Sequence, residues 1–329
     1  MVNPIQIEPG LWVFPIVLPE NPLKWLNCYV ISGERNLLID TGFNRLECLD
    51  ALLAGMDSLR LKPENTDVFL THFHSDHIGG ASTLEKLGYH LIMGKTDYDY
   101  FCVDPMQRLR RVLRCMRLGG MPEDTLQRIY AERGPSRFAP AFFHAETVES
   151  GDVLRYGEYT LRCVEMPGHT PGHICLWSAE KKTLFLGDHV LFDITPNICV
   201  WPEGGDALGE YLNSLERVTQ YEARLALPAH RNRAEISLVD RVEQLRRHHA
   251  ARLDEVRALI RQQPGIDAFH IARQMSWKIH AKSWEEFPIG QQYFAMNEAL
   301  AHLKHLELLG EIWRESKADG NAAFWVSEG

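Results

Sequence analysis

Short apolar runs bounded by turn residues recur along the chain as far as residue 229, and such runs are typical of buried strands. Apolar residues at helical spacing predict helices at 45–60, about 80–87, 206–221 and 236–260. Runs after about residue 147 would build a second sheet, and layered packing allows helices to lie outside two facing sheets. We expect strands at residues 5–18, 27–31, 36–39, 67–71, 90–93, 153–155, 159–163, 174–177, 183–187 and 225–229.

Four residues that can bind metals fall within six positions, directly after the predicted strand at 67–71. They are His72, His74, Asp76 and His77. Neutral imidazole and carboxylate bind zinc and similar divalent ions. His72 and His74 would point the same way in an extended loop, because side chains alternate along such a chain. Asp76 and His77 lie further on and could bind a second ion nearby; the alternative is a polar, solvated loop.

Three later residues of the same kinds each follow a predicted strand, as His72 does. They are His169, Asp188 and His230. Taken alone, each would more often be an ordinary polar residue, but one rim of a sheet could gather all of them beside the first cluster. The sequence therefore indicates a metal site built from distant parts of the chain. We expect His173 to support this site rather than to bind metal.

The motif at 72–77 (His-Phe-His-Ser-Asp-His), the later ligands and residues 38–42 (Leu-Ile-Asp-Thr-Gly) together resemble the metallo-β-lactamase-fold hydrolase superfamily. The resemblance covers roughly residues 10–235, and suggested relatives are glyoxalase II, the lactonases and β-lactamase-like proteins with a winged-helix tail. It implies an α/β fold, a four-layer αβ/βα sandwich, in a catalytic domain at 1–235 with a helical insertion at about 95–140. Residues 236–329 would form a helical linker and a small winged-helix-like C-terminal domain.

Carried over residue by residue, the resemblance implies two divalent metal ions, with Zn²⁺ as the first choice and iron or manganese as alternatives. Asp40 would orient a ligand, or it would only form a turn before a glycine. Asp76 would also take up a proton during catalysis. The implied ligands are His72, His74 and His169 for one ion, Asp76, His77 and His230 for the other, and Asp188 as the bridge between them.

The activity implied by the resemblance is hydrolysis of an ester, thioester or lactone by a metal-bridging hydroxide, which needs no serine or cysteine nucleophile. Two other activities of this fold stay open, a mononuclear-iron sulfur oxygenase and an RNA-cleaving metallo-hydrolase. From another class comes a binding protein without catalysis, which would purify free of metal. The partner that we expect is a small acyl compound, and an anionic form of it is one option.

Composition limits the partners further. The chain has 329 residues, 45% of them hydrophobic, which is enough for the core of one large and one small domain. A formal charge of −9 argues against a general nucleic-acid binder, whose affinity comes largely from neutralising phosphates. Seven scattered cysteines and the lack of a signal-peptide pattern suggest a cytoplasmic protein with reduced thiols. We expect no membrane partner, because no apolar run is long enough to span a bilayer; a homo-oligomer stays open.

Residues 95–140 change character and include an arginine-rich stretch. We expect a helical insertion that caps the active site, or alternatively a surface hairpin packed away from it. If 108–117 is a helix, Arg110, Arg114 and Arg117 share one face at positions i, i+4 and i+7. They would either clamp an anionic end of the substrate through bidentate donors or form the solvated face of an amphipathic helix.

The C-terminal region combines short helical patterns around 271–272 and 296–303 with apolar runs at 312–313 and 324–326. Helices followed by a hairpin resemble the winged-helix tail of some family members. We expect no DNA partner, because a DNA-reading tail normally presents Lys and Arg to phosphates. The tail would instead assist substrate binding or assembly, or would only pack on the main domain. The acidic residues behind this expectation are Glu285, Glu286, Glu298, Glu307 and Asp319.

Overall fold

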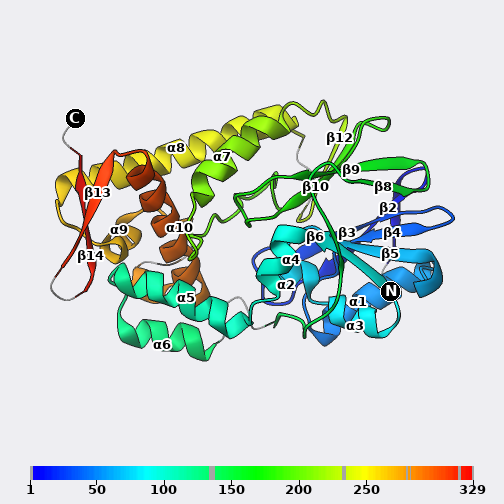
Figure 1. Ribbon diagram of the computed structural model, residues 1–329, viewed down its shortest axis with the longest axis horizontal. Coiled ribbons are helices and arrows are strands. Elements are labelled where there is room, and N and C mark those ends of the chain that lie inside the picture. Colours follow the sequence, from blue (N-terminus) through cyan, green and yellow to red (C-terminus); the bar gives the residue numbers. More distant parts are fainter. Residues whose placement is uncertain are drawn as a thin grey trace. The chain divides into compact units, whose positions relative to one another are not determined.

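Two β-sheets contain most of the apolar runs that predicted strands (Figure 1). The structure is a computed structural model that describes residues 3–132, 138–231, 235–278, 281, 283–317 and 320–327. The first sheet comprises β1 (Ile5–Glu8), β2 (Leu11–Val17), β3 (Trp25–Ile31), β4 (Asn36–Ile39), β5 (Thr66–Leu70), β6 (His90–Gly94) and β7 (Glu146–Val148). The second comprises β8 (Val153–Tyr156), β9 (Tyr159–Glu165), β10 (Ile174–Ser178), β11 (Thr183–Gly187) and β12 (Leu225–Pro228).

The pairing of the strands decides which loops share an edge. The strands predicted at 27–31 and 36–39 form a hairpin, because β3 and β4 pair antiparallel with Tyr29 opposite Ile39. Strands β4 to β7 run parallel, in chain order across the sheet. In the second sheet β11 and β12 are also parallel. The carboxyl ends of parallel strands meet at one edge, so the residues that follow β11 and β12 begin side by side.

The two sheets meet in one apolar layer. Phe69 of β5 and Phe185 of β11 belong to it. The rings of Tyr29 and Phe185 lie edge to face with centroids 5.6 Å apart, a contact that contributes about 0.5–1.5 kcal/mol beyond burial. A second layer lies between the first sheet and its outer helices, and includes Leu52 of α1 (Leu46–Ser58) and Leu84 of α3 (Ala81–Lys86). The α/β sandwich predicted from the sequence is therefore confirmed.

The C-terminal turn of α7 (Ala207–Val218) lies against the second sheet. Ser214 donates a hydrogen bond of 2.8 Å to the carbonyl of Pro167, and Arg217 donates one of 2.8 Å to the carbonyl of Glu165. Helices thus flank both sheets of the sandwich. Among the described residues, no helix has the length and apolar character that crossing a membrane requires.

The metal motif is only partly a loop. Residues 72–74 have no regular secondary structure, as predicted, but Asp76 and His77 lie on a single helical turn, α2 (Ser75–Ile78). The prediction of a helix that begins only after this motif was wrong for these two residues. A short 3-10 turn, η1 (Pro63–Asn65), leads into β5, and α4 (Lys95–Phe101) follows β6. The motif is therefore held between elements of regular structure on both sides.

The described residues form two compact units. The first unit contains residues from 1–103, 138–196 and 214–242, and the second contains residues from 104–137, 197–213 and 243–329. Helix α4 belongs to the first unit, because Phe101 is buried in the layer outside the first sheet. The helical segment in the second unit therefore begins at Asp104. The domain boundary near residue 235 stays a prediction.

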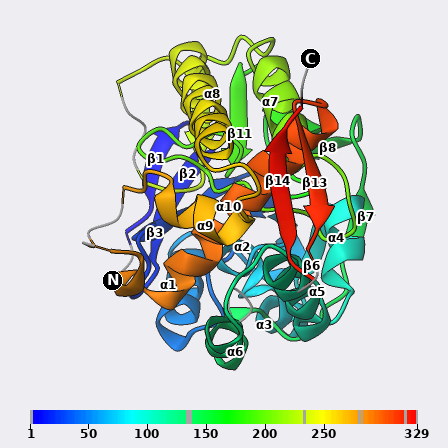
Figure 2. The same ribbon diagram turned by 90° about the vertical axis from the view of Figure 1, so that its left-hand side faces the viewer.

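Helices and one hairpin build the second unit, in which α9, α10 and the hairpin are in contact (Figure 2). Its helices include α5 (Pro105–Leu118), α6 (Glu123–Ala131), most of α8 (Leu238–Gln262), α9 (Ala268–Gln274), η3 (Trp284–Glu286) and α10 (Ile289–Leu308). The hairpin joins β13 (Ile312–Ser316) to β14 (Ala322–Val326). Asp319, in the predicted turn, lies outside the described residues.

Two sequence expectations for this unit can be compared directly with the structure. The helix predicted at 108–117 is present within α5 and is amphipathic, with Leu109, Leu113 and Met116 at 5% exposure or less. The short helices predicted around 296–303 are one helix of 20 residues, α10. A single proline, Pro288, stands at its N-terminus, so nothing interrupts the helix after it. The description of this tail as a winged helix stays a prediction.

Candidate metal centre

Four strand ends carry the predicted ligands toward one point in the first unit. The segment after β5 carries the first four, and the segments after β9, β11 and β12 carry one each. Within the described part of the chain, three groupings have ligand atoms that all lie within 4.8 Å of one another, and together they contain every ligand predicted from the sequence. These ligands are His72, His74, Asp76, His77, His169, Asp188 and His230.

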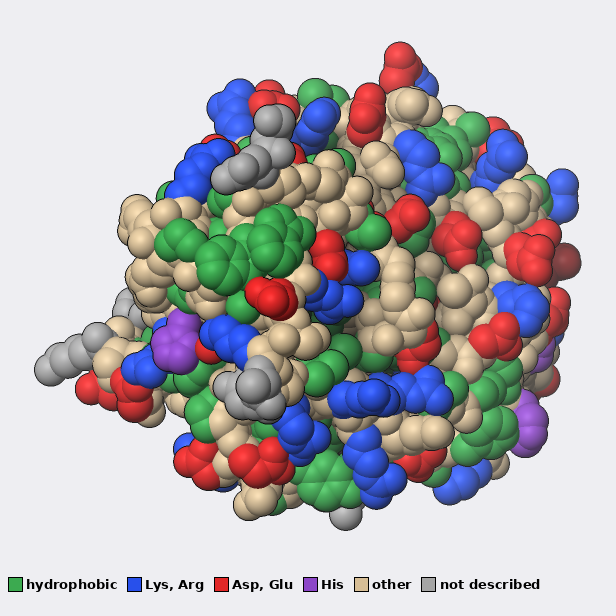
Figure 3. All heavy atoms as spheres, turned by 60° about the vertical axis from the view of Figure 1, so that its left-hand side comes forward, with side chains coloured by type: hydrophobic (Ala, Val, Ile, Leu, Met, Phe, Trp, Pro, Cys, Tyr) green, Lys and Arg blue, Asp and Glu red, His purple; other side chains and the backbone are tan. Residues whose placement is uncertain are grey.

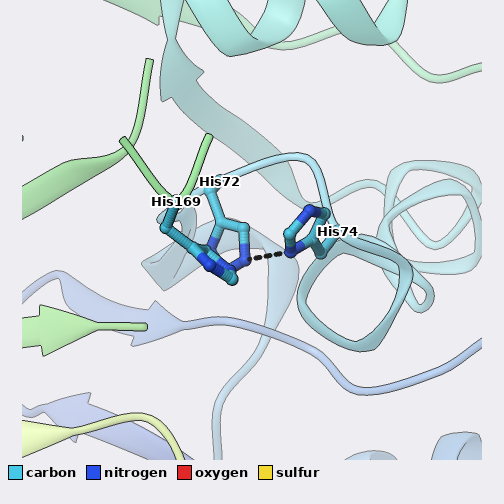
Figure 4. Close-up of side chains that lie close together, drawn as sticks. All are labelled: His72, His74 and His169. Carbon is cyan, nitrogen blue, oxygen red and sulfur yellow. Dashed lines mark hydrogen bonds between the residues drawn. The ribbon is translucent and has the colours of Figure 1, made fainter. Parts of the chain in front are cut away.

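The first grouping consists of three histidines, His72, His74 and His169. Nε2 of His72 lies 3.1 Å from Nδ1 of His74. The ring centroid of His169 lies 4.5 Å from that of His74 and 5.0 Å from that of His72, with both ring pairs nearly perpendicular. Figure 4 shows the three side chains gathered in this way. The sequence expectation that His72 and His74 converge is confirmed.

The second grouping joins Asp76 and His77 of α2 to His230. Nε2 of His230 lies 3.2 Å from Nε2 of His77 and 3.3 Å from Oδ2 of Asp76. His77 and His230 are almost completely buried, and Asp76 is 8% exposed. Three donor atoms from two distant segments therefore face one small volume with little access to water.

Asp188 lies between the two groupings. Its Oδ1 lies 3.5 Å from Nε2 of His77 and 3.3 Å from Nε2 of His230, whereas its Oδ2 lies 3.6 Å from Nε2 of His169. Each carboxylate oxygen thus faces a different set of histidines. A carboxylate in this position could contribute one oxygen to each of two ions.

Hydrogen bonds behind the rings orient them. Nδ1 of His77 lies 2.8 Å from the buried Asp40 carboxylate, and Nδ1 of His230 lies 2.9 Å from the carbonyl of Trp25. Both rings donate their Nδ1 protons, because these partners accept hydrogen bonds, and the Nε2 lone pairs are left to face the centre. Asp40 also accepts a bond of 2.9 Å from the backbone N–H of Thr71. Its predicted role in orienting a ligand agrees with this geometry.

Charges in the centre suit metal binding. Burial, together with neighbouring histidines, lowers the pKa of His72 well below its usual range and that of His74 to about 3. Burial alone would raise the pKa of Asp76, but the imidazoles of its group outweigh this and lower it to about 2. Burial of Asp188 is likewise outweighed by nearby histidines, which hold its pKa well below its usual range. Burial would lower the pKa of His77 and of His230, but nearby carboxylates outweigh it and raise both. These two rings would therefore release a proton on binding a divalent cation, whereas neutral His72 and His74 and the ionised carboxylates already have the forms that bind one.

Two observations test whether a metal fits. Two nitrogens on one tetrahedral zinc ion lie about 3.3 Å apart, given Zn–N bonds of about 2.0–2.1 Å, and the facing nitrogens here lie 3.1 and 3.2 Å apart. Within the described residues, the buried Oδ1 of Asp188 accepts no hydrogen bond. A buried carboxylate oxygen without a donor is costly unless a cation compensates it. The residues present therefore fit divalent metal ions.

Asp97 of α4 is a residue of this centre that the sequence did not reveal. Its carboxylate is fully buried and accepts hydrogen bonds from the backbone N–H of Phe73 at 3.1 Å, from the hydroxyl of Thr170 at 2.6 Å and from the backbone N–H of Gly172 at 2.6 Å. Asp97 thus joins the segment that carries the first ligands to the segment that carries His169. No signal in the sequence marks it, because an aspartate in the first turn of a helix is common.

His173 supports the centre, as expected. Its Nε2 accepts a hydrogen bond of 3.1 Å from the backbone N–H of Asp188. The residue before that aspartate, Gly187, has a φ of +51°, and a Cβ there would lie only 2.5 Å from Nε2 of His173. Glycine is therefore required for this turn, because a side chain would push the histidine away and displace Asp188.

Comparisons with known proteins agree with this geometry. The sequence model of the metallo-beta-lactamase superfamily matches residues 26–230, and that of the metallo-beta-lactamase-like C-terminal domain matches residues 285–327. The chain is 27% identical to a beta-lactamase domain protein from Burkholderia ambifaria, with a TM-score of 0.84 over 99% of this chain and 94% of that one. A metallo-beta-lactamase family protein from Thermus thermophilus is 25% identical, with a TM-score of 0.81 over 98% and 100%.

Relatives with more specific names are similar at comparable levels. The probable metallo-hydrolase YqjP of Bacillus subtilis is 25% identical over 90% of this chain and 92% of its own length. An atrochrysone carboxyl ACP thioesterase of Emericella nidulans is 27% identical over 65% of this chain, and the match spans 54% of that protein, about half its length. Because the superfamily model matches more than half of the chain, this chain belongs to the metallo-beta-lactamase superfamily.

Proposed function

We propose that the chain is a dinuclear metal-dependent hydrolase of acyl thioesters, within the ester, thioester and lactone class expected from the sequence. The position of Asp188 carries the dinuclear part of this proposal. Its two oxygens face different histidines at 3.3 to 3.6 Å, an arrangement that a single ion would not require. Zn²⁺ is the metal that we propose first, because imidazole and carboxylate suit it.

Each ligand group then has a defined task. The three histidines of the first group would hold one ion, the Asp76 group would hold the other, and Asp188 would bind both. When bound, divalent ions lower the pKa of a water molecule and polarise the substrate carbonyl. Asp40 keeps the His77 ring in the orientation that binds metal. The Asp76 carboxylate, which is ionised and slightly exposed, would take up a proton from the attacking water and return it to the leaving thiolate, which departs as the thiol.

The thioester part of the proposal is supported by the printed names of relatives. Several are atrochrysone carboxyl ACP thioesterases, at 24–28% identity. Because this chain matches about half of their length, the substrate class comes from a partial likeness. A small acyl group is the partner that we propose, and DNA and membranes are not.

Metal analysis tests the dinuclear proposal. Gently purified protein should contain close to two equivalents of divalent metal per chain, and metal-depleted protein should take up two equivalents of Zn²⁺ in titration calorimetry. A stoichiometry that stays at one under metal-replete conditions would reject it. Iron alone, together with oxygen uptake, would favour the sulfur oxygenase instead.

Substrate comparison tests the reaction class. Metal-defined protein should release thiol from an acyl-N-acetylcysteamine thioester faster than it opens a lactone or cleaves a phosphodiester. The same protein treated with chelator is the control, and it should be inactive until metal is restored. Preference for the phosphodiester would instead support the RNA-cleaving alternative.

The C-terminal tail stays proposed as an accessory rather than a DNA reader. Two acidic side chains behind that expectation are paired, Glu285 with Arg273 and Glu307 with Arg314 at 2.9 Å. Glu298 is buried, so it adds nothing to the surface charge that DNA would meet. Salt-sensitive binding of duplex DNA at micromolar protein would contradict the proposal.

A further inference from the structure

A groove lies between α5 and α6 in the second unit, with a volume of about 480 Å³. Its floor is apolar, because Leu113 and Leu126 are buried there. Tyr130, 37% exposed, stands at its wall. Three arginines, one glutamate and one glutamine complete the lining, which consists of Arg110, Leu113, Arg114, Arg117, Glu123, Leu126, Gln127 and Tyr130. The groove therefore combines an apolar base with a cationic wall.

The arginines of α5 are not equivalent. Nη1 of Arg111 lies 2.6 Å from the Glu203 carboxylate, and Arg117 contacts both oxygens of Glu123 at 2.8 and 2.9 Å. These two positive charges are compensated within the unit. The charges that matter for a partner are those without such a carboxylate.

Arg110 and Arg114 are exposed, and among the described residues neither forms an ion pair. Arg110 donates a hydrogen bond of 2.9 Å to the hydroxyl of Tyr130, and its guanidinium lies 5.7 Å from the centre of that ring. The tyrosine positions Arg110 but does not neutralise it. Two like charges four residues apart on a helix repel each other, and an anionic group bound between them would relieve that repulsion.

The charge of α5 contrasts with that of the whole chain. The helix contains five arginines and no acidic residue, whereas the chain carries a formal charge of −9. Figure 3 shows one face of the molecule, where Lys and Arg side chains gather beside hydrophobic ones in its lower half. Local positive charge on an acidic protein selects acidic partners and speeds their approach.

We propose that this groove docks an acidic helix of an acyl carrier protein, whose carboxylates would meet Arg110 and Arg114 while apolar side chains cover Leu113 and Leu126. The inference rests on the proposed function, because a carrier is the form in which the named relatives receive their thioesters. It adds a partner and a surface to that function. The sequence expected the same arginines either to clamp a substrate at the metal site or to be merely solvated; docking of a carrier protein differs from both.

The direct test is binding, independent of catalysis. A fluorescently labelled acyl carrier protein without an acyl group would be titrated with metal-loaded protein at low and at physiological salt. The variant Arg110→Gln/Arg114→Gln should weaken binding about tenfold, because charged contacts at a rim mainly steer and hold the partner. The matched control is Arg128→Gln, which removes an exposed arginine from α6 outside the groove, and it should change binding less than twofold.

A second measurement links docking to turnover. The double variant should raise KM for an acyl thioester on the carrier by about the same factor. It should leave kcat/KM for the neutral N-acetylcysteamine thioester and the metal content unchanged. Arg110→Lys/Arg114→Lys should keep most of the carrier binding, because long-range charge rather than bidentate geometry carries the attraction.

Several results would overturn the inference. Equal carrier binding by wild type and the double variant would do so, as would equal loss in Arg128→Gln, since net charge alone would then explain the effect. Displacement of the carrier by millimolar inorganic phosphate would mean that a small anion occupies the groove. If no thioester is hydrolysed, the proposed function is wrong, but the binding assay still shows whether the groove binds a carrier protein. If thioesters are hydrolysed without charge-dependent carrier binding, only the proposal that the groove docks a carrier protein is wrong.

Discussion

Each unit buries a cluster of histidines with acidic groups, and of these two clusters the described residues arrange only that of the first unit for a metal. The first is the metal centre, whose ligands all belong to the first unit. The second, here named the Glu298 cluster, consists of His249, Arg252, Glu298 and His302, each 8% exposed or less. Within the described residues, none of these four belongs to a metal-binding grouping. Residue type is similar in the two clusters, so geometry makes the difference.

In the Glu298 cluster, the side chain of Arg252 supplies the positive charge. Nε of Arg252 lies 3.6 Å from Glu298, and its guanidinium lies 4.3 Å above the ring of Trp277. Nδ1 of His302 donates a bond of 2.7 Å to the backbone carbonyl of Glu298, and Nε2 of the same ring lies 3.3 Å from Nδ1 of His249. Both nitrogens of His302 therefore face protein partners, although Nε2 of His249 has no hydrogen-bond partner among the described residues. In the metal centre, by contrast, His77 and His230 turn their Nε2 atoms toward a shared volume.

The pKa of Glu298 is shifted in the opposite direction to those of Asp76 and Asp188. Burial raises the pKa of Glu298 to about 7, although Arg252 and Asn197 oppose the shift. For Asp76 and Asp188, charged neighbours outweigh burial and lower the pKa instead. Several imidazoles around one buried carboxylate thus lower its pKa, whereas a single arginine beside Glu298 does not overcome the effect of burial. A buried acid is a credible metal ligand when its environment keeps it ionised and leaves an oxygen available.

The largest expected effect is on turnover, which should depend on the metal centre and not on the Glu298 cluster. Asp188→Ala should lower turnover by more than about 100-fold, because losing even an orienting partner of a ligand costs about 10- to 100-fold. Metal content should fall from two equivalents toward one. Glu298→Gln, which removes the charge of the buried acid in the other cluster, should keep both the metal content and the rate. Near-normal turnover of Asp188→Ala would remove the bridge from the proposal.

A smaller effect is expected on stability and concerns Glu298. A carboxyl group whose pKa is raised on folding binds more protons in the folded state than in the unfolded state. Its contribution to stability is therefore fully present below the pKa of the unfolded state. That contribution is lost as the pH rises through the pKa of the folded state. A shift from 4.5 to about 7 means that the free energy of unfolding falls by roughly 3 kcal/mol between about pH 4.5 and 7.

Glu298→Gln does not titrate, so its free energy of unfolding should lack this decrease. Urea unfolding of metal-saturated wild type and variant at about pH 5 and pH 8 measures the difference, and metal effects common to both cancel. Parallel pH dependence in the two proteins would show that Glu298 ionises normally. The comparison between the clusters would then lose its electrostatic basis.

The smallest effect is expected at Asp97, which touches no metal ligand but holds their segments together. Asp97→Asn keeps the shape of the side chain. The carboxylate of Asp97 accepts three hydrogen bonds, but the NH₂ group of asparagine is a donor, so at least one of these three bonds would be lost. Metal affinity, measured by competition with a chromogenic chelator, should fall about 10- to 100-fold. The control is Asp99→Asn, two residues along α4 at an exposed ion pair with Lys95. Equal affinity in all three proteins would leave Asp97 with no role in the centre.

The sequence determined the ligands and most of the sandwich because the signals for both are local. Four metal-binding side chains within six residues are visible without any folding. The same holds for β3 and β4, whose apolar runs predicted two strands on either side of a short polar turn. The sequence also indicated the amphipathic face of α5, because helical spacing is a property of neighbouring residues.

Only the tertiary structure decided how distant side chains meet. Asp97 is an ordinary helix residue until the segments before and after it fold around its carboxylate. Glu298 looked like surface charge, yet packing of α8 against α10 places Arg252 beside it. Which oxygen of Asp188 faces which histidine depends on the parallel pairing of β11 with β12 and on the turn at Gly187. Such contacts join segments that are far apart along the chain, and a periodic pattern reports only neighbours, so no local signal could have predicted them.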